Sequence, residues 1–257
     1  MKKHPRRFIL NLYNRIDRLK YFAGIKPKEN LIILTAADSS HFKSLVQFIK
    51  SVKKYESNST LIIYNLGLTE EEDNFIKNNF KNILFNKFDY SKYPSYLCIT
   101  ENYGQYAWKA VVVFDVLNQY KGKVLWMDAG CVITQPLFRI RDCLKKNGFY
   151  CGISKGVVRE WTHSGMLNYI GCNSHLLEKR NLSTAAAGFN YDCEKARAIV
   201  DEWRKYSLIK ECIAPDGSDK SNHRQDESLL TVLFYKHRFP EHFLMRRIGF
   251  KIHQDID

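Results

Sequence analysis

The sequence predicts an α/β fold with a mostly parallel, Rossmann-like central sheet and helices on both of its faces. Two observations lead to this prediction. Short apolar runs alternate with helical segments from residue 31 to residue 127, which is the pattern of right-handed strand–helix–strand crossovers. In addition, the chain has 257 residues, of which 45% are apolar, enough for one large α/β domain or two small ones.

The alternation is regular in the first half of the chain. The expected elements are a strand at 31–35, a helix at 41–55, a strand at 60–66, a helix from 70 to 80, a strand at 82–85, a loop at 86–101, a helix at 103–120 and a strand at 123–127. Thr69 and Glu72 have the spacing of a capping box, so the helix is expected to begin directly after Thr69.

After Gly130 the pattern becomes looser. The expected elements are a helix near 137–146, a strand at 149–154, a polar loop at 155–172, a strand, turn and helix within 183–203, and a helix at 223–237. No repeat, low-complexity tract or linker interrupts this order. We therefore expect one catalytic domain at 29–257 and a separate segment at 1–28.

Residues 1–28 form a basic amphipathic appendage. They hold nine Lys and Arg against one acid, Asp17, and so carry +8 of the chain's net charge of +13. Pro5 and Gly24 fit the two ends of a helix. Its expected apolar stripe is Phe8, Ile9, Leu12, Tyr13, Ile16 and Leu19. Two interpretations stay open: the helix rests on an anionic membrane surface, or it docks its apolar stripe on the domain.

The composition also favours a location. No apolar run is long enough to span a membrane, the N-terminus lacks the features of a secretory signal, and the seven cysteines include no C-x-x-C pair. We therefore expect a cytoplasmic protein, peripheral on the inner face of a membrane if the helix binds there. Nucleic acid is not an expected partner, because the charge is concentrated in a short tail and the aromatic residues follow core periodicity.

Asp128 is the first candidate functional residue. It follows the apolar strand KVLWM and precedes Ala129 and Gly130. A carboxylate at a buried strand end needs a cation or hydrogen-bond donors, and two small neighbours leave room for a ligand near the backbone. An Asp that only caps the next turn is the alternative.

Four stretches together resemble the GT-A-fold glycosyltransferases that use nucleotide sugars, and most of all the retaining, glycogenin-type group. They are ILTAADSS, YAWKAVVVFDVLNQYKGKVLWMDAG, AAAGFNYDC and HRQDESLL, and they span roughly residues 31–235. The resemblance implies a site for the donor nucleotide sugar built from Thr35, Ala36, Ala37, Asp38, Tyr106, Lys109, Asp128, Ala129, Gly130, Ala187, Gly188 and Arg224.

The resemblance also implies catalytic roles for Asp128, Gln225 and Asp226, with Gln225 near the anomeric carbon and Asp226 holding sugar hydroxyls or stabilising an oxocarbenium-like transition state. Helix capping is the alternative for Asp226. The expected loop at 155–172 offers stacking and hydrogen-bonding groups for an acceptor sugar, or forms a lid. Its candidate acceptor residues are Trp161, His163, Ser164 and Tyr169.

The sequence departs from the family at its metal-binding motif. The family has Asp-x-Asp, whereas the third position here is Gly130. Mn²⁺ or Mg²⁺ can still bind through Asp128, the donor diphosphate and waters, and His253 takes a place comparable to the late histidine ligand of relatives.

The predicted function is transfer of a glycosyl group from a nucleoside-diphosphate sugar to a hydroxyl of a cell-surface glycan or lipid-linked acceptor, with retention favoured by the resemblance. The alternative is nucleotidyl transfer to a sugar phosphate. That alternative is weakened because TAADSS is a poor substitute for a glycine-rich phosphate loop.

Overall fold

The computed structural model describes residues 5–172, 174–241 and 249–257, with side chains from residue 12 onward. The strands are β1 (Ile32–Asp38), β2 (Thr60–Gly67), β3 (Ile83–Lys87), β4 (Lys123–Met127), β5 (Val132–Ile133), β6 (Phe149–Val157), β7 (Arg180–Asn190) and β8 (Phe250–Lys251). The α-helices are α1 (Pro5–Phe22), α2 (Phe42–Tyr55), α3 (Glu70–Asn79), α4 (Ala107–Tyr120), α5 (Phe138–Asn147), α6 (Val158–Trp161), α7 (Ser164–Ile170), α8 (Glu194–Ser207), α9 (Lys210–Ile213) and α10 (Gln225–Lys236).

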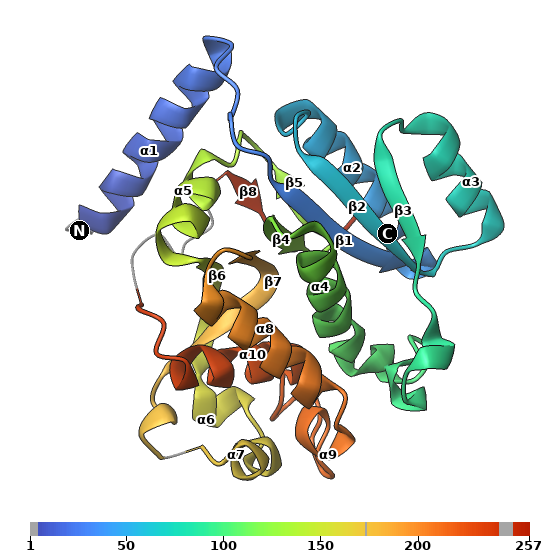
Figure 1. Cartoon of the computed structure of the whole chain (residues 1–257), viewed down its shortest axis with the longest axis vertical. Coiled ribbons are helices and arrows are strands. Elements are labelled where there is room, and N and C mark those ends of the chain that lie inside the picture. The colour runs from blue at the N-terminus through green and yellow to red at the C-terminus, as the bar shows by residue number, and fades with distance from the viewer. Residues whose placement is uncertain (1–4, 173, 242–248) are drawn as a thin grey trace.

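Six strands form the central sheet in the order β3-β2-β1-β4-β7-β6 (Figure 1). The pairs β3–β2, β2–β1 and β1–β4 are parallel, and β7 is antiparallel to both of its neighbours. Five of the six strands therefore run the same way. The predicted α/β fold with a mostly parallel sheet is confirmed.

Helices cover both faces of the sheet because β1 is apolar on both sides. Ile32 and Leu34 belong to the core cluster that contains residues of α4, α8 and α10. Leu31 and Ile33 belong to the cluster on the other face, with residues of α2 and α5. Successive side chains of a strand point to opposite faces, so a continuous apolar run needs a helical layer on each side.

A small second sheet returns the end of the chain to the middle of the fold. β8 pairs with β5, and the Gln254 N–H donates to the Gly130 carbonyl oxygen at 2.8 Å. The Asp257 carboxylate then accepts from the Lys43 N–H at 2.8 Å, in the first turn of α2. Because an acid at a helix N-terminus is favourable, this contact fixes residues 253–257 beside the carboxyl ends of β1 and β4.

Three predicted elements differ from the structure. The helix expected from residue 103 begins at Ala107, because residues 102–106 form a 3-10 turn with left-handed backbone angles. The loop expected at 155–172 is largely regular: β6 extends to Val157, and α6 and α7 follow. β7 begins at Arg180, three residues earlier than expected, and pairs with this extension of β6.

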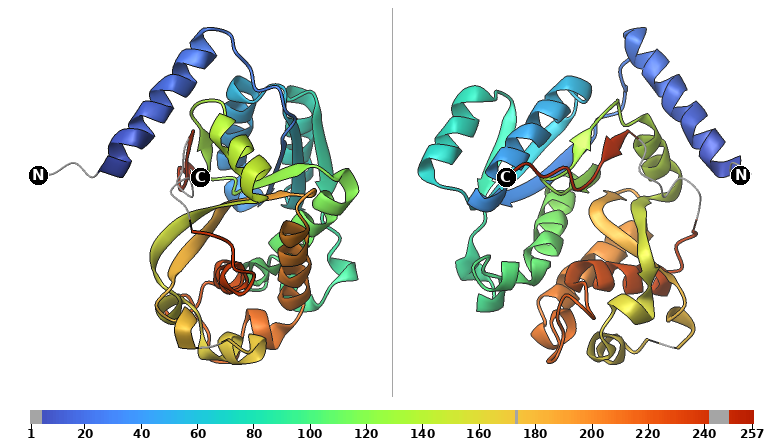
Figure 2. Two further views of the ribbon diagram at one scale, coloured as in Figure 1. Left: turned by 60° about the vertical axis from the view of Figure 1, so that its left-hand side comes forward. Right: turned by 180° about the vertical axis from the view of Figure 1, so that it is seen from behind.

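Helix α1 lies along the outside of the molecule, beside α5 (Figure 2). The Asp17 carboxylate is buried there and accepts a hydrogen bond from Arg139 Nε at 3.2 Å. Of the predicted stripe, Leu12 and Leu19 are exposed and do not make this contact, and the side chains of Phe8 and Ile9 lie outside the described part of the chain. Among the described residues, no helix is both long enough and apolar enough to cross a lipid bilayer.

Candidate functional site

Two adjoining cavities lie at the carboxyl ends of β1 and β4, close to Asp128. The first has a volume of about 280 Å³ and the second of about 450 Å³. Ligands of parallel α/β sheets bind at this edge, because loops and helix N-termini converge there. Both cavities are lined by the same five residues, Tyr106, Lys109, Asp128, Ala185 and His253.

A buried lysine connects the two cavities. The side chain of Lys109 is only 5% exposed, and its Nζ lies 3.2 Å from Asp128 Oδ1 and 3.0 Å from Asp226 Oδ2. Burial alone lowers the pKa of a lysine, but the two carboxylates outweigh burial and raise the pKa of Lys109. The ammonium therefore stays protonated and holds together two carboxylates from β4 and α10.

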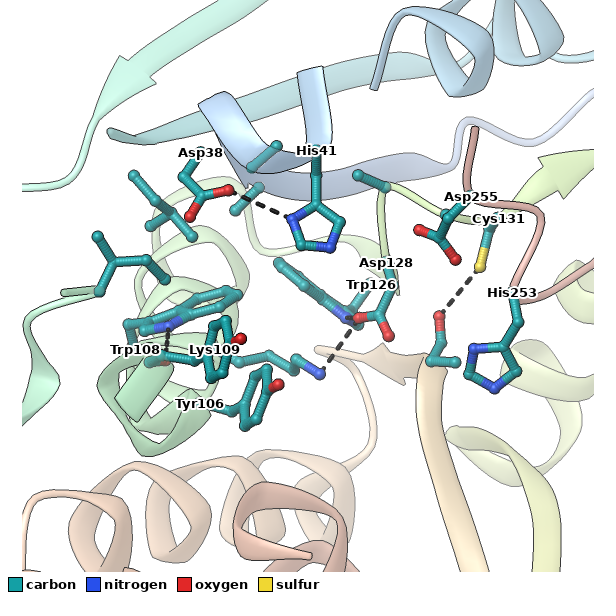
Figure 3. Close-up of a pocket in the computed structure, with 18 residues that line it drawn as sticks. Asp38, His41, Tyr106, Trp108, Lys109, Trp126, Asp128, Cys131, His253 and Asp255 are labelled. Carbon is teal, nitrogen blue, oxygen red and sulfur yellow. Dashed lines mark hydrogen bonds and ion pairs between the residues drawn. The ribbon is translucent and has the colours of Figure 1, made fainter. Parts of the chain in front are cut away.

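Asp128 points into open space although its strand is buried. Its side chain is 39% exposed, and Oδ1 accepts a hydrogen bond from Trp126 Nε1 at 2.8 Å. Figure 3 shows this carboxylate between Lys109 and the C-terminal residues His253 and Asp255. Lys109 and Trp126 fix one oxygen of the carboxylate, and the side chain reaches the cavity where a ligand can approach it.

The first cavity combines the end of β1 with aromatic side chains. Ala36, Ala37 and Asp38 line it, but Thr35 is fully buried and absent from the lining. Asp38 contacts His41 Nδ1 at 3.3 Å. This hydrogen bond lowers the pKa of Asp38 and raises that of His41, so the pair favours a charged carboxylate beside a charged imidazole.

The turn before α4 builds an aromatic wall of the same cavity. Tyr103 and Tyr106 stack with ring centroids 6.0 Å apart, and both side chains line the space. Both have left-handed backbone angles, with φ values of 57° and 54°. Such angles are strained for residues with a Cβ, and strain of this kind concentrates at functional sites.

Strand β7 contributes different residues from those expected. Ser183, Thr184 and Ala185 line the second cavity, whereas Ala187 and Gly188 do not. Because β7 is antiparallel to β4, its earlier residues lie at the carboxyl end of β4, and Gly188 pairs with Leu125 inside the sheet. A Cβ at Gly188 would meet Leu144, so this glycine serves core packing rather than a ligand.

The first turn of α10 forms the opposite wall. Arg224, Gln225, Asp226 and Glu227 all line the second cavity. Gln225 has a left-handed φ of 37°, again at a residue that faces the cavity. Burial, followed by the neighbouring charge of Asp226, raises the pKa of Glu227 to about 7. Burial also raises the pKa of Asp226, and Lys109 opposes that effect.

The predicted acceptor residues are not brought together at the cavities. Trp161 reaches the site only through Arg224, whose guanidinium lies 4.0 Å from the centre of its ring. His163 caps α7 by accepting from the Gly165 N–H at 3.1 Å, and Ser164 is the first residue of that helix. Tyr169 packs at the surface against Tyr206. These roles follow from α6 and α7, which the sequence pattern did not reveal.

The space beside Gly130 is filled from the far end of the chain. A Cβ at position 130 would collide with the Asp255 carboxylate, which lines the first cavity together with Asp128 and His253. Within the described part of the chain, no three His, Cys, Asp or Glu side chains converge as a ready-made metal cage. Two carboxylates facing one cavity nevertheless suit Mg²⁺ or Mn²⁺, which bind through one or two carboxylates plus phosphate oxygens.

Several lining residues were missed by the sequence analysis. They are His41, Leu66, Ile99, Tyr103, Trp108, Trp126, Cys131, Ser183, Thr184, Ala185, Lys220, Glu227 and Asp255. Glu227 directly follows Asp226, so the motif that identified Asp226 could also have identified Glu227. Asp255 carries no such signal, because only the pairing of β8 with β5 brings it to Gly130.

Comparison with known sequences gives one partial match. Residues 9–114 match the family described as "Protein of unknown function (DUF1647)", which is less than half of the chain. No curated protein matches the sequence significantly.

Comparison with solved structures identifies the fold. Core-mannan synthase A from Aspergillus fumigatus, solved in a Mn/GDP form, aligns with a TM-score of 0.53 at 8% identity over 81% of this chain and 70% of its own. Mouse xyloside xylosyltransferase 1 aligns with 0.52 at 9% identity over 83% and 84%. The bifunctional glycosyltransferase WbbM aligns with 0.51 at 13% identity over 82% of this chain and 38% of its own. The chain therefore has a GT-A-type fold.

Proposed function

We propose that the protein is a glycosyltransferase that moves a sugar from a nucleoside-diphosphate sugar to a hydroxyl group of a glycan or lipid-linked acceptor. One observation carries the proposal: Lys109 is buried between Asp128 and Asp226 where the two cavities meet. We assign the nucleotide to the cavity on one side of these three charged groups and the sugar to the cavity on the other side. The GT-A-type fold, which the compared glycosyltransferases share, supports the same assignment.

The nucleoside is assigned to the first cavity. Tyr103 and Tyr106 offer ring faces for stacking a base, and Ala36 and Ala37 leave room against the strand end. Asp38 accepts hydrogen bonds from the ribose hydroxyls in this arrangement. The small side chains matter because the nucleoside must approach the backbone of β1 closely.

The charges around Asp128 call for an additional cation when the diphosphate binds. Lys109 is already paired with Asp128 and Asp226, so the three groups together carry one excess negative charge. Asp128 and Asp255, with His253 beside them, would hold Mn²⁺ or Mg²⁺ against the diphosphate oxygens. When bound, the ion neutralises the charge that develops on the leaving diphosphate.

The transferred sugar is assigned to the second cavity. Asp226 is held by Lys109 and is placed to accept hydrogen bonds from the sugar hydroxyls, or to stabilise positive charge at the anomeric carbon. Gln225 lines the same cavity next to it, and Arg224 and Lys220 supply positive charge at its mouth.

Retention of configuration stays part of the proposal, and so does a cell-surface glycan as acceptor. The proposal also keeps an anionic membrane surface as partner and a cytoplasmic location on the inner face of the membrane.

The decisive experiment combines ligand binding with product analysis. Nucleoside diphosphates and nucleotide sugars are screened by thermal shift with Mn²⁺ and again with EDTA, because a ligand that binds only the native state raises its melting temperature. The stabilising donor is then incubated with candidate acceptors. Glycosyl transfer releases free nucleoside diphosphate, whereas release of pyrophosphate would assign the protein to nucleotidyl transfer.

The first prediction concerns Asp128→Asn. The amide keeps the size of the side chain but removes the charge that faces Lys109 and the cavity, so turnover is expected to fall by roughly a hundredfold or more. Asp201→Asn, at an exposed position of α8, is the matched control and is expected to keep wild-type turnover. Thermal unfolding of both variants checks that the fold is intact. Wild-type turnover in Asp128→Asn would remove the basis for the proposal.

A further inference from the structure

Helix α1 presents two different faces along its described length. Tyr13, Asn14, Asp17, Lys20 and Tyr21 face the domain, whereas Leu12, Arg15, Arg18, Leu19 and Phe22 face away from it, and we call this second set the outward face of α1. Residues spaced three or four apart share one side of a helix, so the two sets lie on opposite sides.

The face that meets the domain is polar and aromatic. The Asp17 carboxylate is fully buried and pairs with Arg139, and Gln135 Nε2 donates to Asn14 Oδ1 at 3.1 Å. The Arg139 guanidinium also lies 4.3 Å from the centre of the Tyr13 ring. These contacts fix the rotation of the helix about its own axis, so the direction of the outward face is determined by the domain.

The outward face exposes large apolar side chains. Leu12 is 46% exposed, Leu19 is 68% exposed and Phe22 is 81% exposed, and Ile25 follows in the next turn at 50%. Docking of α1 on its own domain does not explain these residues, because the contacts to α5 use the other side of the helix. Four large apolar side chains exposed within fourteen residues, on one side of α1 and just after it, indicate an interaction surface.

The charges beside this strip indicate its partner. Arg15, Arg18, Lys26 and Lys28 are exposed next to the apolar side chains. The same side of α1 thus combines apolar groups with cations, and Asp17, the one acid of residues 1–28, is buried on the domain side. A helix that lies in the lipid interface has this combination: apolar side chains enter the acyl boundary, and Lys and Arg meet anionic headgroups.

We propose that the outward face of α1, continued by Ile25, Lys26 and Lys28, is the surface through which the protein binds an anionic lipid bilayer. This inference deepens the membrane contact of the proposed function by naming the residues that make it. It does not depend on the reaction in the cavities. The ion pair of Asp17 with Arg139 joins α1 to the domain, so a bilayer bound at the outward face would also orient the domain.

The experiment is sedimentation of the full chain with vesicles of phosphatidylcholine, with and without phosphatidylglycerol. Wild-type protein is expected to sediment only with the anionic vesicles, and less at high salt, because salt screens the headgroup attraction. The variant L12Q/L19Q/F22Q is expected to lose roughly tenfold or more in binding, since its side chains no longer bury apolar area. The variant R15Q/R18Q is expected to lose a comparable amount on anionic vesicles.

Two controls separate this surface from total charge and from folding. K205Q/K210Q removes two exposed cations from α8 and α9, at the opposite end of the molecule from α1 (Figure 1), and is expected to bind as wild type. In L12Q/L19Q/F22Q, thermal unfolding is expected to be unchanged because these side chains are exposed, and donor binding in solution is expected to be unchanged because none of them lines a cavity.

Three results would overturn the inference. The first is that wild-type protein does not sediment with anionic vesicles. The second is that L12Q/L19Q/F22Q sediments as much as wild type. The third is that wild type is a dimer in solution and this variant is a monomer, which would assign the face to a second copy of the chain. Donor binding is measured on the same samples, so a failure of the membrane surface is distinguishable from a failure of the glycosyltransferase assignment.

Discussion

At the scale of single residues, Lys109 is the cation that compensates the charges of two carboxylates in the site. It is the cation that lies within 4 Å of both Asp128 and Asp226 among the described side chains. A buried carboxylate without a cation is costly, and removal of one partner of a buried ion pair typically destabilises a protein by about 3–5 kcal/mol. The same ammonium group therefore supports the fold and holds the two carboxylates of the proposed site.

Our second prediction tests this dependence with Lys109→Met. The variant is expected to lose about 3–5 kcal/mol of unfolding free energy, because Asp226 then lies buried without its cation. The double variant Lys109→Met/Asp226→Asn is expected to recover most of that loss, because it no longer buries the charged Asp226 carboxylate without a cation. Urea denaturation measures both. Equal stability of the single and double variants would show that the charge of Asp226 does not destabilise the protein when Lys109 is absent.

The third prediction concerns the carboxylate beside Gly130. Asp255→Asn is expected to weaken Mn²⁺-dependent binding of a nucleoside diphosphate by roughly tenfold or more, since one charge-assisted contact contributes about 1.5–3 kcal/mol. Calorimetric titration with and without Mn²⁺ gives the measurement. Asp89→Asn, at an exposed position that lines neither cavity, is the control.

A rescue variant tests whether a carboxylate from position 130 can replace the carboxylate of Asp255. Gly130→Asp in the wild-type background is expected to disturb the site, because its Cβ collides with the Asp255 carboxylate. The same substitution combined with Asp255→Ala places a carboxylate in the vacated space and is expected to restore Mn²⁺-dependent binding. Undiminished binding in Asp255→Asn would remove Asp255 from the proposed cation site.

At the scale of elements, the turn before α4 combines strain with close packing. Gly104 has a φ of 61°, and a Cβ there would collide with the Leu97 carbonyl oxygen. Tyr103 and Tyr106 flank this glycine and form the aromatic wall of the first cavity. Because the backbone of Gly104 fits only without a side chain, the position of both rings depends on it.

The fourth prediction compares Gly104→Ala with Gly171→Ala. Gly171 has a similar φ of 70°, but a Cβ added there would meet no atom within 4 Å, so its substitution costs only about 1–2 kcal/mol of backbone strain. Gly104→Ala is expected to cost more, because the collision adds to the same strain, and also to weaken nucleotide binding. Chemical denaturation and nucleotide titration provide the two measurements. Equal unfolding free energies would mean that the turn relaxes freely.

Local sequence patterns were sufficient to predict the elements that are defined by adjacent residues. The run LIILT predicted β1, and the capping box of Thr69 and Glu72 predicted the start of α3, where Glu72 N–H does donate to the Thr69 hydroxyl at 3.2 Å. These signals are local, because a strand or a cap is defined by adjacent residues. The confirmed fold class follows from their order.

Periodicity failed where distant segments decide the structure. The helical pattern of 103–120 contains no signal for the left-handed turn at 102–106, where the backbone of Gly104 lies too close to the Leu97 carbonyl for a Cβ to fit. Gly188 was expected near the sugar, but the antiparallel pairing of β7 with β4 places it inside the sheet, and Ser183, Thr184 and Ala185 line the second cavity instead. The direction of a strand relative to its neighbour is a tertiary property, so apolar pattern alone does not contain it.

At the scale of the whole molecule, the stability of the fold depends on pH through two buried titratable groups, His223 and Glu227. Burial lowers the pKa of His223 to about 4 and raises that of Glu227 to about 7. Their ordinary values are 6.5 and 4.5. His223 therefore costs stability as pH falls from about 6.5 to 4, because the unfolded chain binds its proton more readily. Glu227 acts in the opposite direction over a similar range.

The last prediction isolates the Glu227 contribution with Glu227→Gln. Below pH 4.5 this acid is protonated in both folded and unfolded states, so the variant and wild type are expected to have a constant difference in stability. As pH rises from 4.5 to about 7, the unfolded wild type loses its proton first, and wild-type stability falls by up to about 1.4 kcal/mol per pH unit relative to the variant. Above pH 7 the difference is expected to level off.

The comparison with wild type is necessary because His223 and Glu227 have opposite effects on the pH dependence of the unfolding free energy and partly cancel each other. Unfolding free energies of both proteins are measured by urea denaturation at several pH values between about 4 and 8, and the difference between them removes His223, which both proteins share. A difference that stays flat across this range would mean that Glu227 ionises as readily in the folded protein as in the unfolded chain. The wall of the second cavity would then be accessible to water at Glu227, and burial would not raise the pKa of this acid.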